Sequence, residues 1–118
     1  MDVFCRFSFA AARRLPNLPQ NHRCSRLHGH TFEVEVVVSG ALEDGREWVV
    51  DFDDLDAACT ELKDELDHRY LNDLTGLDNP TSERLAIWLW LKMIAAFPGL
   101  SAVRVNESPS RGCVYRGV

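Results

Sequence analysis

The sequence predicts an α+β domain in which a four-stranded antiparallel sheet carries two helices on one face. Segments with the alternating apolar pattern of half-buried strands stand near the start and the end of the chain, and two segments with apolar residues at helical spacing lie between them. This order is typical of an antiparallel sheet covered on one side. With 118 residues, 46% of them hydrophobic, the chain is expected to form a single domain over residues 1–118.

The clearest strands lie in the first third of the chain. Residues 3–11 alternate in the period of two that strands have, and residues 31–40 place valines on one face and glutamates on the other. Residues 13–27 contain two prolines and two asparagines, which predicts a loop. Residues 48–50 are expected to return as a short strand that forms a hairpin with residues 31–40.

Both predicted helices have recognisable starts. The helix over residues 55–66 has one apolar face, and Asp51 is expected to cap its first turn. The second helix is expected to start with Thr81 or Ser82 as its cap and to end at residues 98–99, a Pro-Gly pair. It is apolar almost all round, so one sheet face cannot cover it and a second burying partner is implied.

Residues 101–107 and 113–115 are expected to supply the last two strands. A four-stranded sheet of this kind has two open edges, and neither edge strand carries a proline or a clear bulge to blunt it. Pairing with sister subunits would cover these edges.

Composition and charge exclude several classes of protein. The net charge of -5 argues against a nucleic-acid-binding surface, which needs clustered Lys and Arg. No apolar run is long enough to cross a bilayer. The four cysteines are far apart and form no C-x-x-C pair, a pattern of reduced intracellular proteins. We therefore expect a cytoplasmic protein that binds neither nucleic acid nor membrane.

Candidate chemistry begins at the end of the predicted loop. His28 and His30 are two residues apart at the start of a strand, which points both imidazoles to the same face and suits one metal ion. Two histidines alone are weak support, and the ordinary interpretation is that they bind nothing. Cys24 lies among polar residues, so it is not expected in the core, and a thiol near a cation can act as a base or nucleophile.

Three further residues are candidates with ordinary alternatives beside them. Asp67 directly precedes His68 and could fix the tautomer of that imidazole for proton transfer, although a solvent-exposed helix end is the ordinary explanation of the pair. Glu107 ends an alternating strand, where it is either an exposed terminus or a buried acceptor for an N–H-rich heterocycle. The sequence leaves this choice open.

Five ordered features carry a resemblance to a known family. They are FSFAAARRLP (residues 7–16), CSRLHGH (24–30), LDHRYLN (66–72), NPTSE (79–83) and Glu107. Together they resemble the 6-pyruvoyl-tetrahydropterin synthase superfamily over nearly the whole chain, with the closest likeness to its bacterial 6-carboxy-tetrahydropterin synthase branch of the queuosine pathway. The resemblance implies a T-fold (tunnelling fold), in which subunits close their sheets into a barrel and assemble as a hexamer, a dimer of trimers.

The resemblance also implies a reaction and a set of roles. The reaction is the conversion of 7,8-dihydroneopterin triphosphate to 6-carboxy-5,6,7,8-tetrahydropterin, acetaldehyde and triphosphate, a carbon-carbon lyase activity. Glu107 matches the residue that anchors the pterin, and Thr81 falls in a substrate-binding motif. Cys24 matches the catalytic cysteine, and Asp67 and His68 match the pair that relays protons. The alternative within the family is a 6-pyruvoyl-tetrahydropterin synthase.

One position departs from the family pattern. The resemblance implies a Zn²⁺ cofactor held by three histidines, of which His28 and His30 match two, while Arg13 stands in the place of the first. A guanidinium is always protonated and has no lone pair for a metal. Arg13 could turn away while His22, Cys24 or water completes the site, or the metal could be lost and Arg13 could hold a substrate oxyanion or the triphosphate. We expect zinc binding that is weakened but not abolished. A pterin-binding paralogue with lost or altered activity therefore remains a further alternative.

Overall fold

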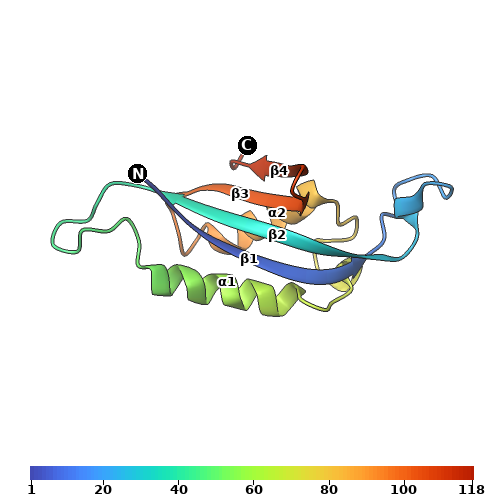
Figure 1. Cartoon of the computed structure of the whole chain (residues 1–118), viewed down its shortest axis with the longest axis horizontal. Helices are drawn as coiled ribbons and strands as arrows, with labels where there is room; N and C mark the ends of the chain where they lie inside the picture. The colour runs from blue at the N-terminus through green and yellow to red at the C-terminus, as the bar shows by residue number, and fades with distance from the viewer.

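The computed structural model describes all 118 residues and shows an open four-stranded antiparallel sheet with both helices on one face (Figure 1). The sheet order is β1-β2-β3-β4, which confirms the predicted fold class. In chain order the elements are β1 (Asp2–Arg13), β2 (His28–Ser39), α1 (Phe52–Leu66), α2 (Ser82–Met93), β3 (Leu100–Ser108) and β4 (Arg111–Tyr115).

The pairing of β1 with β2 decides which side chains face the helices. The register places Phe9 opposite Phe32, and both are buried, so the odd residues of β1 and the even residues of β2 point to the helix side. The same register pairs Arg13 with His28 and Ala11 with His30. The two histidines and the arginine therefore lie on the helix side of the sheet, beyond the end of the core.

The helices cover the sheet as their apolar patterns predict. The buried face of α1 consists of Leu55, Cys59, Leu62 and Leu66, and α2 buries residues along most of its length. The Oδ1 atom of Asp51 accepts from the Asp53 N–H at 2.9 Å, and the Oγ1 atom of Thr81 accepts from the Arg84 N–H at 3.1 Å. Both capping predictions are confirmed, with Thr81 rather than Ser82 as the second cap.

The predicted hairpin between residues 31–40 and 48–50 is wrong. β2 is a central strand whose two edges are taken by β1 and β3, so no edge is left for a further strand. Residues 48–50 instead lie in the connection to α1, where Val49 and Val50 pack against the core. The second helix also ends earlier than expected, at Met93, and turns occupy residues 94–99.

Within one chain, α2 does not find the second burying partner that its composition implies. Trp90 packs edge-on against Tyr115 of β4 with ring centroids 5.4 Å apart, whereas Leu91 is 67% exposed. Neither helix has the length and apolar character needed to span a membrane.

Candidate active site

The end of β1 is held in place by the segment that follows α1. The carbonyl of Ala10 accepts from the His68 N–H at 2.6 Å, and the Ala12 N–H donates to the Arg69 carbonyl at 2.9 Å. The side chain of Asn72 then bonds both the N–H and the carbonyl of Arg14, at 2.9 and 2.7 Å. These contacts on both sides of residue 13 fix the direction of its side chain.

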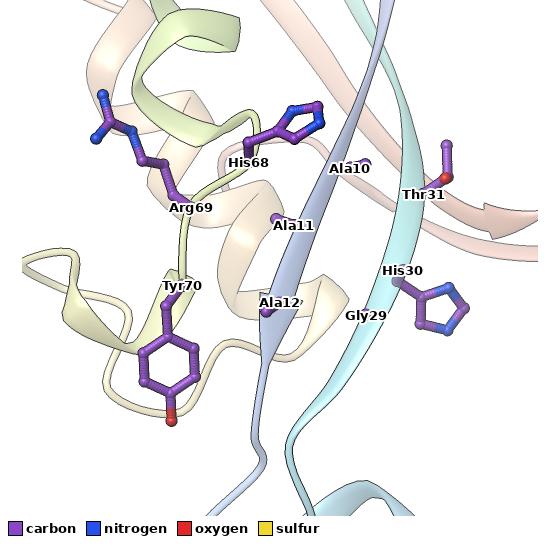
Figure 2. Close-up of a pocket in the computed structure, with 9 residues that line it drawn as sticks. All are labelled: Ala10, Ala11, Ala12, Gly29, His30, Thr31, His68, Arg69 and Tyr70. Carbon is purple, nitrogen blue, oxygen red and sulfur yellow. The ribbon is translucent and has the colours of Figure 1, made fainter.

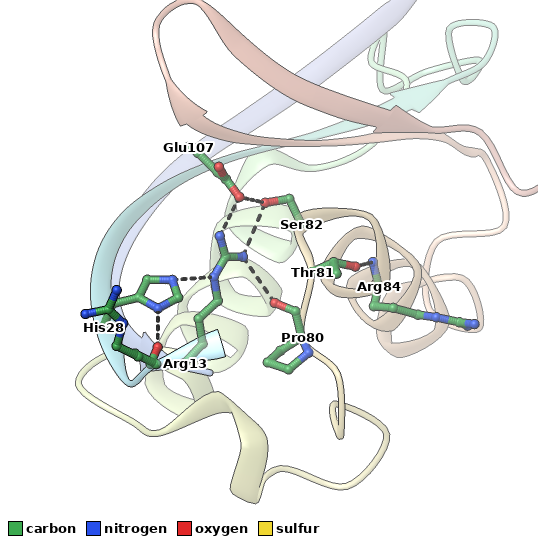
Figure 3. A network of polar contacts seen from close by, with 8 residues as sticks. Arg13, His28, Pro80, Thr81, Ser82, Arg84 and Glu107 are labelled. Carbon is green, nitrogen blue, oxygen red and sulfur yellow. Dashed lines mark hydrogen bonds and ion pairs between the residues drawn. The ribbon is translucent and has the colours of Figure 1, made fainter. Parts of the chain in front are cut away.

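Arg13 points inward and is 2% exposed (Figure 3). Its guanidinium donates to Oε1 of Glu107 at 2.5 Å, to the Pro80 carbonyl at 3.1 Å and, at 3.5 Å, to Oγ of Ser82. Its Nε lies 3.5 Å from Nε2 of His28, and its Cζ lies 4.9 Å from the Phe32 ring centroid. A buried guanidinium needs such partners, because leaving its charge unpaired costs several kcal/mol.

The hydrogen bonds of His28 define its tautomer. Nδ1 lies 2.8 Å from the carbonyl of Arg26, and a carbonyl can only accept, so Nδ1 carries a proton. The Nε2 lone pair of the neutral ring then faces Arg13 Nε. The ring of His30 lies 6.1 Å from that of His28. Desolvation, followed by the charge of Arg13, lowers the pKa of His30.

Glu107 is the acceptor at the centre of this network. Burial opposes its ionisation, but hydrogen bonds from Ser82 and Arg13 and the charge of Arg13 outweigh that effect and lower the pKa of the carboxyl. Ser82 Oγ donates to the same Oε1 atom at 2.5 Å. Sequence reasoning left the environment of Glu107 open and gave Ser82 no role beyond a possible cap.

One cavity brings together four of the expected site residues. It measures about 360 Å³ and is lined by Cys24, His28, His30 and Glu107 together with Arg13, Arg23 and Arg111. Arg23 and Arg111 form no ion pair within the chain, so their charges are available to an anion. The sequence marks Arg23 as a basic residue that could meet a small anionic ligand, but it gives no sign of Arg111, because only the fold brings the β3–β4 turn beside the loop of residues 13–27.

Cys24 lies in a short turn of 3-10 helix, Arg23–Ser25, and His22 directly precedes this turn. Nδ1 of His22 accepts from the Cys24 N–H at 3.1 Å, so one ring nitrogen of His22 is used to cap this turn. His22 does not line the cavity.

Asp67 and His68 contact each other as expected, but both lie outside the cavity that Cys24 lines. Oδ2 of Asp67 is 3.0 Å from Nδ1 of His68, and Oδ1 accepts from the Ala10 N–H at 2.9 Å. The backbone bond from Ala10, followed by the contact with His68, lowers the pKa of Asp67. The side chain of His68 is 83% exposed, and its backbone has a φ of 60°, in the left-handed region that side chains disfavour.

A second cavity of about 660 Å³ has both His68 and His30 in its lining (Figure 2). In that view the two imidazoles lie on opposite sides of the β1–β2 pair. One chain therefore does not bring His68 into the cavity of Cys24. Thr81 lines neither cavity, and its hydroxyl caps α2.

The donors around the two imidazoles do not fit a zinc ion. No three His, Cys, Asp or Glu side chains of the chain are grouped closely enough to hold a metal. The Nε2 lone pair of His28 faces Arg13, and the buried guanidinium fills the space between His28 and Glu107. A divalent cation there would meet a fixed positive charge.

Fold and cavity together indicate a tetrahydropterin synthase-like T-fold domain. The family model described as 6-pyruvoyl tetrahydropterin synthase matches residues 2–118, and the chain belongs to this family. Over 96% of this chain and 91% of the relative, it is 43% identical to the 6-carboxy-5,6,7,8-tetrahydropterin synthase of Synechocystis. Over 82% of this chain and 78% of the relative, it is 38% identical to a dihydroneopterin monophosphate aldolase of Pyrococcus furiosus.

The solved structure of the Caenorhabditis elegans 6-pyruvoyl tetrahydropterin synthase superposes with a TM-score of 0.90 at 25% identity, covering 100% of this chain and 96% of the other. The fold predicted from the sequence and the family predicted from its five features are confirmed.

Proposed function

We propose that the chain is a 6-carboxy-5,6,7,8-tetrahydropterin synthase, a carbon-carbon lyase that forms 6-carboxytetrahydropterin, acetaldehyde and triphosphate from 7,8-dihydroneopterin triphosphate. The observation that carries this proposal is the single cavity that Cys24, His28, His30 and Glu107 share. The 43% identity to a synthase of that name supports the choice of reaction within the family.

Glu107 and the two unpaired arginines suit the two ends of this substrate. Both recorded hydrogen bonds to the Glu107 carboxylate use Oε1, which leaves Oε2 for the N–H groups of a pterin ring. Arg23 and Arg111 supply positive charge for the triphosphate, to which guanidinium groups can donate two parallel hydrogen bonds.

Proton transfer is assigned to Cys24 and to the Asp67–His68 pair. Cys24 lines the cavity directly. His68 is exposed at the edge of the sheet, and we propose that it reaches the substrate when chains assemble and the pocket is completed between subunits. The assembly proposed is a homo-oligomer, a hexamer built as a dimer of trimers, working in the cytoplasm. Zinc, which the resemblance implies, has no step in this proposal, because the donor set does not fit it.

The reaction is tested by measuring both small products with purified protein and dihydroneopterin triphosphate. We expect acetaldehyde and triphosphate in equal amounts. Cys24→Ala should lower kcat by about 100-fold or more, a typical loss for a removed acid–base group. Cys113→Ala is the matched control, since Cys113 is a half-buried thiol on β4 outside both cavities.

The same assay separates the alternatives. Release of triphosphate without acetaldehyde would indicate a 6-pyruvoyl-tetrahydropterin synthase instead. Binding of a pterin without either product would indicate a paralogue with lost activity, the second candidate function. That candidate is favoured by one specific observation, the buried Arg13 between His28 and Glu107.

A further inference from the structure

We propose that Arg13 is a built-in cation that takes the place of a metal ion in this cavity, so that the assembled protein holds no divalent metal at His28 and His30. This inference goes beyond the proposed function and does not depend on it, because metal content and stability are measured without substrate.

The backbone of β1 prevents Arg13 from turning away. Residue 13 is in register with His28 on one side of the strand. On the other side, the hydrogen bonds of Ala12 to Arg69 and of Arg14 to Asn72 fix the residues before and after it. A shift of register by one residue would reverse every side chain of β1 and expose the apolar ones, so the strand keeps the Cβ of Arg13 on the helix side of the sheet.

The guanidinium is bonded in its buried position. Its nitrogens have acceptors in Glu107, Pro80, Ser82 and His28, and one of its faces lies over the ring of Phe32. A metal ion at Nε2 of His28 would have to displace this group and leave Glu107 and the Pro80 carbonyl without it. Because Arg13 is 2% exposed, the loss of these hydrogen bonds and of the ion pair with Glu107 is strongly unfavourable.

The charge of Arg13 performs two of the tasks that a metal ion would perform. It pairs with the Glu107 carboxylate and, together with the Ser82 hydroxyl, lowers the pKa of that carboxyl, and its Nε donates toward Nε2 of His28. It does not offer an open coordination position, and its recorded donors are engaged within the chain. Arg13 is therefore a positioning residue that acts on a ligand through Glu107 and His28, which argues against a direct role in holding a substrate oxyanion.

Metal content after dialysis against excess zinc, and then against metal-free buffer, tests this inference in the assembled protein. We expect the unchanged protein to retain less than about one-tenth of a zinc ion per chain, and its melting temperature not to change with zinc or chelator. Arg13→His should retain about one zinc ion per chain and gain the visible absorption of tetrahedral Co²⁺ when cobalt is added. Arg14→His is the matched control and should behave like the unchanged protein.

Two results would overturn the inference. One is about one zinc ion per chain in the unchanged protein that is lost in His28→Ala. The other is a folded Arg13→His variant that binds no more zinc than the unchanged protein. If Arg13→His fails to fold, the comparison of the unchanged protein with His28→Ala decides alone. A second readout is the ¹⁵N spectrum of His28, which should show the Nδ1–H tautomer in the unchanged protein and be indifferent to zinc.

Discussion

Glu107 joins β3 to the end of β1 and the start of α2 through one carboxylate oxygen. Glu107→Gln keeps the shape but leaves the buried Arg13 facing a neutral amide. We expect a loss of about 2 kcal/mol in the free energy of unfolding at pH 7, the range for hydrogen bonds to charged groups. Urea unfolding at one fixed protein concentration measures it, and Glu33→Gln, exposed and unpaired, should change the value by less than about 0.5 kcal/mol.

The pH dependence of that loss follows from the lowered pKa of Glu107. A carboxyl with a lowered folded-state pKa contributes stability that is present above its unfolded pKa, about 4.3, and is lost as pH falls through the folded value. The difference between Glu107→Gln and the unchanged protein should therefore shrink as the pH falls from about 5 through the folded-state pKa of Glu107. A difference that stays constant over that range would show that the charge of Glu107 contributes nothing.

His68 combines an exposed imidazole with a backbone φ of 60°. A residue with a side chain in this conformation costs about 1 kcal/mol or more, and glycine avoids the cost. We expect His68→Gly to be about 1 kcal/mol more stable than His68→Ala in urea, while both lose kcat by about 100-fold. Equal stability of the two variants would mean that the backbone relaxes without cost.

At the scale of elements, the sequence predicted what local chemistry decides. The caps at Asp51 and Thr81 were predictable because a side-chain oxygen bonds an N–H only two or three residues away. Residues 48–50 were misassigned because strand propensity does not reveal that β1 and β3 already occupy both edges of β2. The Arg13–Glu107 pair joins residues 94 positions apart, and no periodicity in the sequence indicates such a contact.

The side chain of Asn72 hydrogen-bonds the N–H and the carbonyl of Arg14, as a neighbouring strand would, at the end of β1. Asn72→Ala removes both bonds at an exposed site, so we expect a loss of about 1 kcal/mol in global stability. Local opening should be affected more. Amide hydrogen exchange at residues 12–14 should become about tenfold faster or more, while β3 keeps its rates. Uniform acceleration across the sheet would indicate global unfolding and contradict this local role.

At the scale of the whole molecule, one chain is incomplete as an enzyme of the proposed kind. Cys24 and Glu107 share a cavity, but His68 lies at the sheet edge outside it, and Leu91 of α2 stays exposed. Both β1 and β4 are edge strands. A partner subunit paired along these edges would account for the position of His68, the exposure of Leu91 and the two open strands together.

Ser8 offers a direct test of pairing along β1. The N–H groups of Ala10 and Ala12 point away from β2 toward residues 67–70, so by the period of two the N–H of Ser8 also points outward. Ser8→Pro removes that donor without breaking the ladder to β2 and places a ring where a partner strand would dock. We expect sedimentation to show the proposed hexamer replaced by smaller species, with melting still cooperative and acetaldehyde release lost. Ser8→Ala keeps the N–H and should assemble normally. A Ser8→Pro variant that still sediments as the unchanged assembly would show that this part of β1 is not an interface between subunits.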